Sequence, residues 1–380
     1  MARSVVIIGA GVVGSALARV LADEGAEVVA IDRSSRDVLP GSTGHAPGFV
    51  GLYLEDEVHI DLAQRSAEMY DRYPQAFRRV GGLDVADTPA GAAALHARAE
   101  RAREHGLDIE RISVADAAAL APALVDPTRV IHAQRSRLDG AADARALVLA
   151  LRADAVSRGA RFRWGEPVTG IEQRGGRLVV RIGEDEMTAD DVVLAGGLWG
   201  GGLAELAGVS LPLVPVGHPY VYSSGQQRQT NGPLVRFAQH GIYARVHDDR
   251  IGLGCYAHPV VDATSATTGV SAELDWMPDL FDPVVAAAVS VLPQASRFVP
   301  DLRLNGVFSM TPDGRPHLGS IAAVPGLWSA QAIWVTHAGG AAVELARMMR
   351  DGDDGLGPFA PGRFEGVSDE RLRAQALHLY

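Results

Sequence analysis

Residues 5–14 read VVIIGAGVVG, an apolar run that leads directly into a glycine-rich turn. The apolar run predicts a buried parallel strand, and a helix is expected to begin near Val12. Gly9, Gly11 and Gly14 have the spacing that permits a tight turn, close approach of the backbone to a pyrophosphate and close packing of the helix. Because the N–H groups and the dipole of a helix N-terminus favour negative charge, this turn predicts a dinucleotide site.

The segment after this helix favours a dinucleotide with an unmodified ribose. Residues 27–31 read EVVAI and predict a second strand, which delivers Asp32 at its end. A carboxylate at this position accepts a hydrogen bond from a ribose hydroxyl and would repel a 2′-phosphate, which argues against NADP. A signal peptide over residues 5–22 is the alternative, but only Arg3 is basic before the apolar run, and the glycine spacing would then be a coincidence.

Length and composition favour a soluble enzyme of two domains. The chain has 380 residues, of which 47% are hydrophobic, and a single core usually stops growing at ~250–300 residues. No stretch approaches the ~18–20 uninterrupted apolar residues of a membrane span, so no membrane is expected as a partner. The net charge of −11 argues against nucleic acid. The single cysteine, Cys255, excludes an intramolecular disulfide and favours a cytoplasmic location.

The chain contains no lysine, so all 35 of its Lys and Arg residues are arginine. This composition excludes a pyridoxal Schiff base, a P-loop lysine and any mechanism that needs a lysine amine. The 12 histidines show no HExxH or paired ligand spacing, so no metal site is expected.

Several separate segments together resemble the FAD-dependent D-amino-acid oxidase superfamily. They are the N-terminal turn and residues 195–199 (AGGLW), 311–314 (TPDG) and 334–340 (WVTHAGG). Within that superfamily, residues 41–48 (GSTGHAPG) are similar to a loop of the dimethylglycine oxidase and sarcosine/dimethylglycine dehydrogenase group. The resemblance covers nearly the whole chain, and this loop is its most specific part.

The order of the predicted elements indicates that a second domain is interleaved with the first. The predicted fold class is α/β, with a Rossmann-like FAD-binding domain and a smaller α+β substrate domain built on a mainly antiparallel sheet. The FAD-binding domain is expected to be discontinuous and to comprise residues 1–85, 140–210 and 309–380. The substrate domain is expected to comprise residues 86–139 and 211–308, and the latter stretch reads mainly as strands.

The resemblance implies FAD bound covalently to His45 through the 8α-methyl carbon. A neutral imidazole is nucleophilic, and a glycine-rich loop lets it reach the dimethylbenzene edge of the flavin. Ser42 and Thr43 would contact the phosphates, Val168 would hold the adenine through its backbone, and residues 334–340 would lie beside the pyrimidine end of the isoalloxazine. The residues expected to bind the cofactor are Gly9, Gly11, Val12, Val13, Gly14, Asp32, Arg33, Ser42, Thr43, Gly44, His45, Phe49, Val168, Ala195, Gly196, Trp199, Trp334, Val335, Thr336, His337 and Gly339.

The candidate catalytic residues are His218, Tyr243 and Arg245. Period-two alternation places Tyr243, Arg245 and His247 on one face of a strand. By the resemblance, His218 and Tyr243 match a histidine and a tyrosine that line the site beside the flavin, where they would orient an amine and manage its proton. Arg245 is a candidate for bidentate binding of a substrate carboxylate, with a surface position as the alternative.

The resemblance implies an amine oxidoreductase. A hydride would pass from an N-methylated glycine-like secondary or tertiary amine, of the dimethylglycine or sarcosine type, to flavin N5, and hydrolysis of the iminium would complete an oxidative demethylation. Relatives of this group usually continue into a folate-binding region, whereas this sequence stops at Tyr380, so either formaldehyde is released or a separate folate-binding partner captures it. Sarcosine oxidase-like relatives use a lysine to activate oxygen, which leaves both molecular oxygen and a protein electron acceptor as candidates.

Three alternatives remain. The first is another specificity on the same scaffold, such as another small amino acid, a cyclic N-methyl amino acid, or a natural-product amine or hydrazine. Phe308 stands where some amino-acid oxidases of the superfamily carry a carboxylate-binding arginine, which leaves the substrate open. The second is a flavin subunit that mainly carries electrons in a heteromeric complex. The third is an NAD-dependent dehydrogenase, against which the loop with His45 argues.

Overall fold

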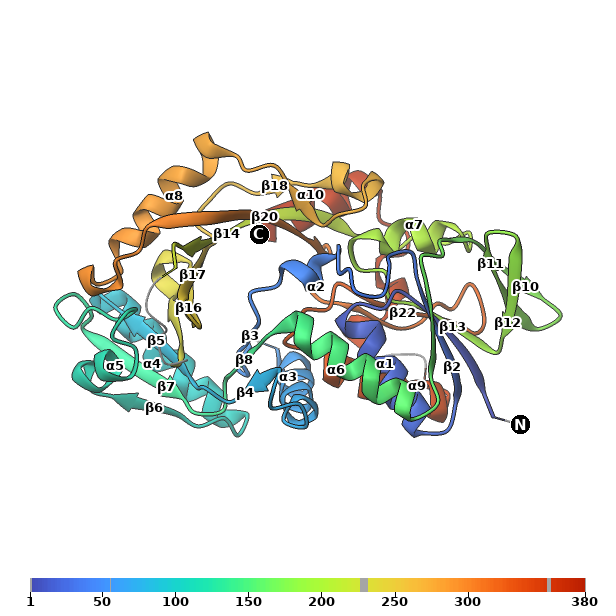
Figure 1. Ribbon diagram of the computed structural model, residues 1–380, viewed down its shortest axis with the longest axis horizontal. Coiled ribbons are helices and arrows are strands. Elements are labelled where there is room, and N and C mark those ends of the chain that lie inside the picture. The colour runs from blue at the N-terminus through green and yellow to red at the C-terminus, as the bar shows by residue number, and fades with distance from the viewer. Residues whose placement is uncertain (1, 55, 226–231, 354–356, 380) are drawn as a thin grey trace.

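The computed structural model describes residues 2–54, 56–225, 232–353 and 357–379, and its largest two sheets lie on different sides of the molecule (Figure 1). The first sheet has the strand order β21-β22-β13-β1-β2-β9. Its strands are β1 (Ser4–Ile8), β2 (Glu27–Asp32), β9 (Arg161–Trp164), β13 (Asp191–Leu194), β21 (His317–Ser320) and β22 (Leu327–Gln331). All of them pair in parallel except β21, which is antiparallel to β22. The predicted α/β class is therefore confirmed.

The central strands of the first sheet, β1, β2 and β13, are buried on both faces because consecutive positions along them carry apolar side chains. Val5 and Ile7 of β1 share a core with the helices, whereas Val6 and Ile8 share a core with the small antiparallel sheet on the other face. The helices are α1 (Val12–Asp23), α3 (Glu57–Tyr70), α6 (Ala144–Ser157) and α9 (Ala338–Asp351). The other face is covered by β10 (Val168–Arg174), β11 (Arg177–Ile182), β12 (Asp185–Ala189) and α7 (Gly200–Glu205).

The large sheet is mainly antiparallel, as predicted, and only the pairing of β5 with β15 among its described pairs is parallel. Its strands are β5 (Gly82–Ala86), β6 (Ile109–Ile112), β7 (His132–Ser136), β14 (Val214–Ser223), β15 (Leu234–Phe237), β16 (Ile242–His247), β17 (Arg250–Cys255), β18 (Val261–Asp262), β19 (Glu273–Leu274) and β20 (Pro300–Met310). A separate small sheet contains β3 (Phe49–Val50), β4 (Phe77–Arg78) and β8 (Gly140–Ala142). Strand β5 lies at the end of the first predicted segment of the FAD-binding domain, and the domain boundaries stay a prediction.

Side chains alternate along β16 as predicted, and this alternation shows which face of the large sheet is apolar. Ile242, Ala244 and Val246 belong to a core beneath α5 (Val114–Leu120) and α8 (Pro278–Ser290). Tyr243 and its neighbours on the opposite face are only partly buried. Helix α4 (Pro89–Glu104) lies beside the same sheet (Figure 1). The sheet therefore has one apolar face under helices and one polar face.

Residues 211–308 consist mainly of strands, as predicted, but they also contain a helix, α8, that the sequence analysis did not predict. Pro278 occupies the first turn, where its missing N–H costs nothing, and Pro283 lies inside the helix. Phe281, Val285 and Ala288 are buried at helical spacing. The two prolines concealed a helical period that the apolar positions alone would have indicated.

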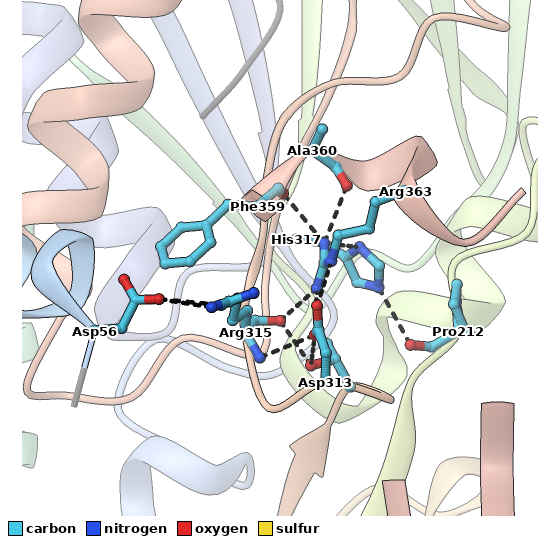
Figure 2. A network of polar contacts seen from close by, with 9 residues as sticks. Asp56, Pro212, Asp313, Arg315, His317, Phe359, Ala360 and Arg363 are labelled. Atoms are coloured by element: carbon cyan, nitrogen blue, oxygen red, sulfur yellow. Dashed lines mark hydrogen bonds and ion pairs between the residues drawn. The ribbon is translucent and has the colours of Figure 1, made fainter. Parts of the chain in front are cut away.

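A buried arginine holds the C-terminal segment against the first sheet (Figure 2). The segment comprises η5 (Gly357–Phe359), η6 (Pro361–Phe364) and α10 (Asp369–Leu379). Arg363 donates to both carboxylate oxygens of Asp313 at 2.9 Å and to Nδ1 of His317 at 3.1 Å. Since a guanidinium can only donate, Nδ1 accepts, and Nε2 of His317 donates to the carbonyl oxygen of Pro212 at 3.2 Å. His317 is therefore neutral in this network.

Within the described ranges, no helix combines the length and the apolar character that crossing a membrane requires.

Candidate active site

The glycine-rich turn makes the close backbone contacts that its sequence predicts. Gly9 has a φ of +107°, and a Cβ atom there would lie 2.4 Å from the carbonyl oxygen of Ala195. A Cβ atom at Gly14 would lie 1.9 Å from the carbonyl oxygen of Gly9. Side chains are thus excluded at both positions, and the turn presents bare backbone at the start of α1.

A cavity of about 1330 Å³ begins at this turn. It runs along residues 39–43, 45–49, 195–199 and 332–336 and reaches His218 and Tyr243 of the large sheet. This volume exceeds the ~300–1,000 Å³ of an ordinary small-molecule pocket. The space is therefore suited to an extended dinucleotide together with a small substrate.

Most residues predicted to bind the cofactor line this cavity. They are Gly9, Gly11, Val12, Val13, Asp32, Arg33, Ser42, Thr43, His45, Phe49, Val168, Ala195, Gly196, Trp199, Trp334, Val335 and Thr336. The structure places Gly14, Gly44, His337 and Gly339 behind the wall instead.

The backbone at these positions packs closely against neighbouring segments, behind the residues that line the cavity. A Cβ atom at Gly44 would lie 1.9 Å from the carbonyl oxygen of Leu39, and one at Gly339 would lie 2.9 Å from the Cα atom of Ser66. His337 is buried in front of α9, with its ring 5.1 Å from that of His59. In this structure these residues support the backbone behind the cavity lining, and their part in cofactor binding stays a prediction.

Asp32 supports the turn as well as lining the cavity. Its Oδ2 atom accepts from the backbone N–H of Ala10 at 2.8 Å, and its Oδ1 atom accepts from the N–H and the hydroxyl of Ser34 at 2.8 and 2.6 Å. A carboxylate has about four acceptor positions, so it can still accept from a ribose hydroxyl. Next to it, the guanidinium of Arg33 lies 4.1 Å from the ring centre of Trp199.

The loop with His45 forms a single helical turn, α2 (Ser42–His45). Nδ1 of His45 lies 3.1 Å from the carbonyl oxygen of Gly41, and Nε2 lies 3.3 Å from Oε2 of Glu273. A carbonyl can only accept, so Nδ1 carries a proton in this geometry. The hydroxyl of Ser42 donates to the carbonyl oxygen of Val307 at 2.7 Å. The large sheet therefore holds this loop in place.

The sheet end of the cavity carries a hydrogen-bonded histidine–tyrosine pair. Nε2 of His218 lies 2.8 Å from the hydroxyl oxygen of Tyr243, and both residues line the cavity. Tyr256 also lines it, and its ring centre lies 4.3 Å from that of His218. Gly254 makes room for the pair, because a Cβ atom there would lie 2.2 Å from Cζ of Tyr243.

The cavity wall formed by His218, Tyr243 and Tyr256 disfavours charged groups, because His218 is buried. Burial and, to a smaller extent, the nearby His258 lower the pKa of His218 to about 3. His218 is therefore uncharged at neutral pH, and a cation without a partner would be destabilised beside it.

Arg245 does not reach the cavity. Its Nη1 atom donates to the carbonyl oxygens of Pro47, Gly48 and Ala142 at 2.9, 3.3 and 3.0 Å. These contacts tie the end of the loop with His45 to β8. The alternation on β16 correctly gave the face of Arg245, which in this structure supports the loop, and its carboxylate-binding role stays a prediction.

Four polar residues at the far end of the cavity were not predicted. They are Tyr53, Asp84, Arg98 and Arg236. Arg236 lies directly opposite Tyr243 in the pairing of β15 with β16. Alternation along residues 234–237 gives a signal for this face, but the pairing of β15 with β5 brings together segments about 150 positions apart.

A profile of the family "FAD dependent oxidoreductase" matches residues 4–348, which is most of the chain. The chain belongs to the FAD dependent oxidoreductase family. Its similarity to human mitochondrial dimethylglycine dehydrogenase is 27% identity over 92% of this chain and 42% of the relative. It is also 28% identical to a 4-methylaminobutanoate oxidase (formaldehyde-forming) of Paenarthrobacter nicotinovorans, over 96% of this chain and 46% of the relative. The chain thus spans less than half the length of these curated relatives.

Solved structures of this FAD dependent oxidoreductase family have the same fold. An L-proline dehydrogenase from P. horikoshii superimposes with a TM-score of 0.84, at 22% identity, over 96% of this chain and 98% of that one. A glycine oxidase from Geobacillus kaustophilus superimposes with a TM-score of 0.77 at 20% identity, over 96% of this chain and all of that one. The Rossmann-like FAD-binding fold joined to an antiparallel sheet, predicted from the sequence, is therefore confirmed.

The residues of the cavity fit the cofactor of this family. The side-chain-free turn at the start of α1 suits a pyrophosphate, and Asp32 at the end of β2 suits a ribose. His45 lines the cavity between this turn and the histidine–tyrosine pair. The long cavity therefore has suitable polar groups along its course for an FAD molecule.

Acid should destabilise the protein before its carboxylates are protonated. Burial is the main cause that lowers the pKa values of His218 and His337 to about 3 and of His317 to about 4. An unfolded histidine has a pKa near ~6.5, so the unfolded state binds more protons below that pH. Stability is therefore complete above pH ~6.5 and should fall by up to about 1.4 kcal/mol per pH unit for each histidine as the pH drops toward 4.

Urea unfolding at pH 7.5, 6.5, 5.5 and 5.0 measures this slope. The variant His337→Phe keeps an aromatic ring against His59 but lacks one titrating group. Its free energy of unfolding should therefore change less steeply with pH, by the contribution of one proton. A free energy of unfolding that stays constant from pH 7.5 to 5.0 would contradict the prediction.

Proposed function

We propose that this protein oxidises an N-methylated, glycine-like secondary or tertiary amine with bound FAD. The observation that carries the proposal is the His218–Tyr243 pair, 2.8 Å apart, at the end of a cavity that begins at the dinucleotide turn. When bound, FAD accepts a hydride from the carbon next to the amine nitrogen. The resulting iminium hydrolyses to an aldehyde and the demethylated amine.

The residues of the wall control the protonation of the substrate. Oxidation requires a free lone pair on nitrogen, so an incoming ammonium must lose its proton. The burial that lowers the pKa of His218 also disfavours an ammonium beside it. The Tyr243 hydroxyl, held by Nε2 of His218, orients the neutral amine. Burial of His218 keeps water away from this side of the reacting carbon.

Anaerobic bleaching of the flavin by a panel of amines tests this proposal. Dimethylglycine and sarcosine should reduce the flavin, whereas amines without an N-methyl or α-carbon hydride donor should not. Air-saturated buffer then tests molecular oxygen as the electron acceptor, and slow reoxidation favours a protein acceptor. Formaldehyde in the product without any added protein favours free release over capture by a folate-binding partner. If no amine bleaches the flavin, the proposed function is wrong.

We also propose that His45 carries the flavin covalently. Nδ1 contacts the carbonyl oxygen of Gly41, so Nε2 is the nitrogen available for the 8α carbon. Glu273, 3.3 Å from Nε2, is placed to stabilise the positive charge that the ring acquires when the Nε2 lone pair forms this bond. The cytoplasmic location predicted from the single cysteine stays a prediction.

Acid precipitation should leave the yellow colour with the wild-type polypeptide and release it from His45→Ala. The intact mass of the wild-type chain should exceed the sequence mass by one FAD. His96→Ala is the matched control, because His96 is two-thirds exposed on α4. Release of the flavin from the wild-type protein would disprove the covalent bond and leave FAD binding unaffected.

A further inference from the structure

Arg236 belongs to a row of residues that crosses the polar face of the large sheet. Tyr220 pairs with Gly254, Gly254 with Tyr243, Tyr243 with Arg236, and Arg236 with Asp84. Side chains of directly paired residues lie on the same face, with Cβ atoms about 4.5–5.5 Å apart in an antiparallel pair. Arg236 is therefore the cationic neighbour of the catalytic tyrosine.

Two buried carboxylates hold the Arg236 guanidinium in a fixed orientation. Nε donates to Oδ1 of Asp84 at 2.7 Å, and Nη2 donates to Oδ2 of Asp139 at 2.8 Å. Asp139 is itself fixed, since its Oδ1 atom accepts from the N–H of Leu52 and the hydroxyl of Ser136. The side chains of Asp84 and Asp139 are 3% and 1% exposed. The two fixed carboxylates therefore hold the Arg236 guanidinium in one orientation.

The remaining nitrogen, Nη1, is not engaged by the two aspartates. Over the described parts of the chain, no acceptor lies within hydrogen-bond distance of it, although Arg236 lines the cavity and its side chain is 22% exposed. Gly51 leaves space beside it, because a Cβ atom there would lie 2.4 Å from Nη1. The two N–H groups of Nη1 are therefore available to a ligand in the cavity next to Tyr243.

The charges around Arg236 leave it able to attract an anion. Nε of Arg98 lies 3.9 Å from Oδ2 of Asp84, and the Arg98 guanidinium is 4.3 Å from the ring centre of Tyr53. Two arginines thus balance the two aspartates Asp84 and Asp139. An incoming carboxylate does not meet an excess of negative charge.

We propose that Arg236 binds the carboxylate of the substrate through Nη1, so that the substrate class is N-methylated amino acids rather than simple amines. This inference rests on the proposed function, and it assigns to Arg236 the role that the sequence suggested for Arg245. A carboxylate at Nη1 places a nitrogen two bonds away toward Tyr243. The position of Arg236 one strand beyond Tyr243 is then a determinant of substrate specificity.

The test compares ligands with and without a carboxylate in wild-type and Arg236→Gln protein. Trimethylglycine has no nitrogen lone pair and cannot be oxidised, and choline is its counterpart without a carboxylate. Changes in the flavin absorbance give both dissociation constants. Loss of a hydrogen bond to a charged group should weaken trimethylglycine binding roughly 10- to 150-fold, while choline binding stays within about 3-fold. For turnover, kcat/KM for dimethylglycine should fall to the same extent, and that for its amide should not.

Two further variants keep the test decisive. Arg236→Gln leaves Asp84 and Asp139 unpaired and can unfold the sheet, so Gly51→Ala provides a second route, because its methyl group displaces Nη1 without removing any charge. It should produce the same selective loss. Arg111→Gln, on the exposed edge strand β6 of the same sheet, should change neither ligand's affinity.

Equal losses for trimethylglycine and choline, or no loss for trimethylglycine in either variant, would overturn the assignment of Arg236. If no amine bleaches the wild-type flavin, the proposed function fails, and the trimethylglycine–choline comparison still decides on Arg236.

Discussion

Tyr243→Phe should lower the rate constant of anaerobic flavin reduction about 10²- to 10⁴-fold, the range for loss of a group that holds or moves a proton in the reaction. The hydroxyl of Tyr243 lies 2.8 Å from Nε2 of His218 and lines the cavity. Phenylalanine retains the ring but removes the only atom of this side chain that can orient the amine nitrogen. Stopped-flow absorbance with dimethylglycine measures the rate.

His218→Asn should have a similar effect, and the double variant should be little worse than either single one. Residues that act as a unit are not additive, so this result would show that the pair works together. Because burial lowers the pKa of His218 to about 3, the imidazole stays neutral from pH 5 to 9. The pH profile of the wild-type rate should therefore lack a histidine ionisation, and His218→Asn should not shift it.

Tyr222→Phe is the matched control for Tyr243. Tyr222 lies on β14, outside the cavity lining, and packs its ring 5.0 Å from that of His247. This variant should retain the wild-type rate. A Tyr243→Phe protein that works at close to the wild-type rate, or a Tyr222→Phe protein that is equally impaired, would disprove the assigned roles.

Arg363→Met should lower the free energy of unfolding by roughly 1–3 kcal/mol, the cost of leaving partly buried polar groups without a partner. The Arg363 side chain is only 11% exposed and binds both oxygens of Asp313 (Figure 2). It also donates to the carbonyl oxygens of Phe359 and Ala360. Methionine satisfies none of these acceptors, so the C-terminal segment should detach first. Urea unfolding measures the difference.

Arg174→Met is the control for this loss of charge. Arg174 also has two carboxylate partners, Glu172 and Glu186, but its side chain is 58% exposed. Solvent screens such a pair, so the variant should unfold at the wild-type urea concentration. The double variant Arg363→Met/Asp313→Leu should recover part of the lost stability, because no charge is then left unpaired. Equal effects at positions 363 and 174 would contradict the argument.

Local patterns predicted the nucleotide-type half of the fold well. The apolar run before Gly9 became β1, the helix begins at Val12, and β2 ends at Asp32. Each of these features depends on residues close together in the chain, so the sequence contains the whole signal. Helix α8 escaped this reasoning because Pro278 and Pro283 interrupt its period.

The candidate site was predicted only in part, for a reason of geometry. Alternation along β16 predicted that Tyr243 and Arg245 share a face, and they do. The face alone does not say what lies opposite each side chain. In the structure, Arg245 meets the carbonyl oxygens of Pro47 and Gly48, while Arg236 reaches the cavity.

The sequence alone indicates a dinucleotide enzyme, through the glycine spacing, the acidic residue after β2 and the loop with His45. They encode a binding surface made from one continuous stretch of chain, where neighbours in sequence are neighbours in space. The catalytic wall is assembled differently. Asp84, Arg236 and Tyr243 come together through strand pairings between distant segments. The register of those pairings depends on the packing of the whole sheet, so only the tertiary structure could decide which arginine faces the substrate.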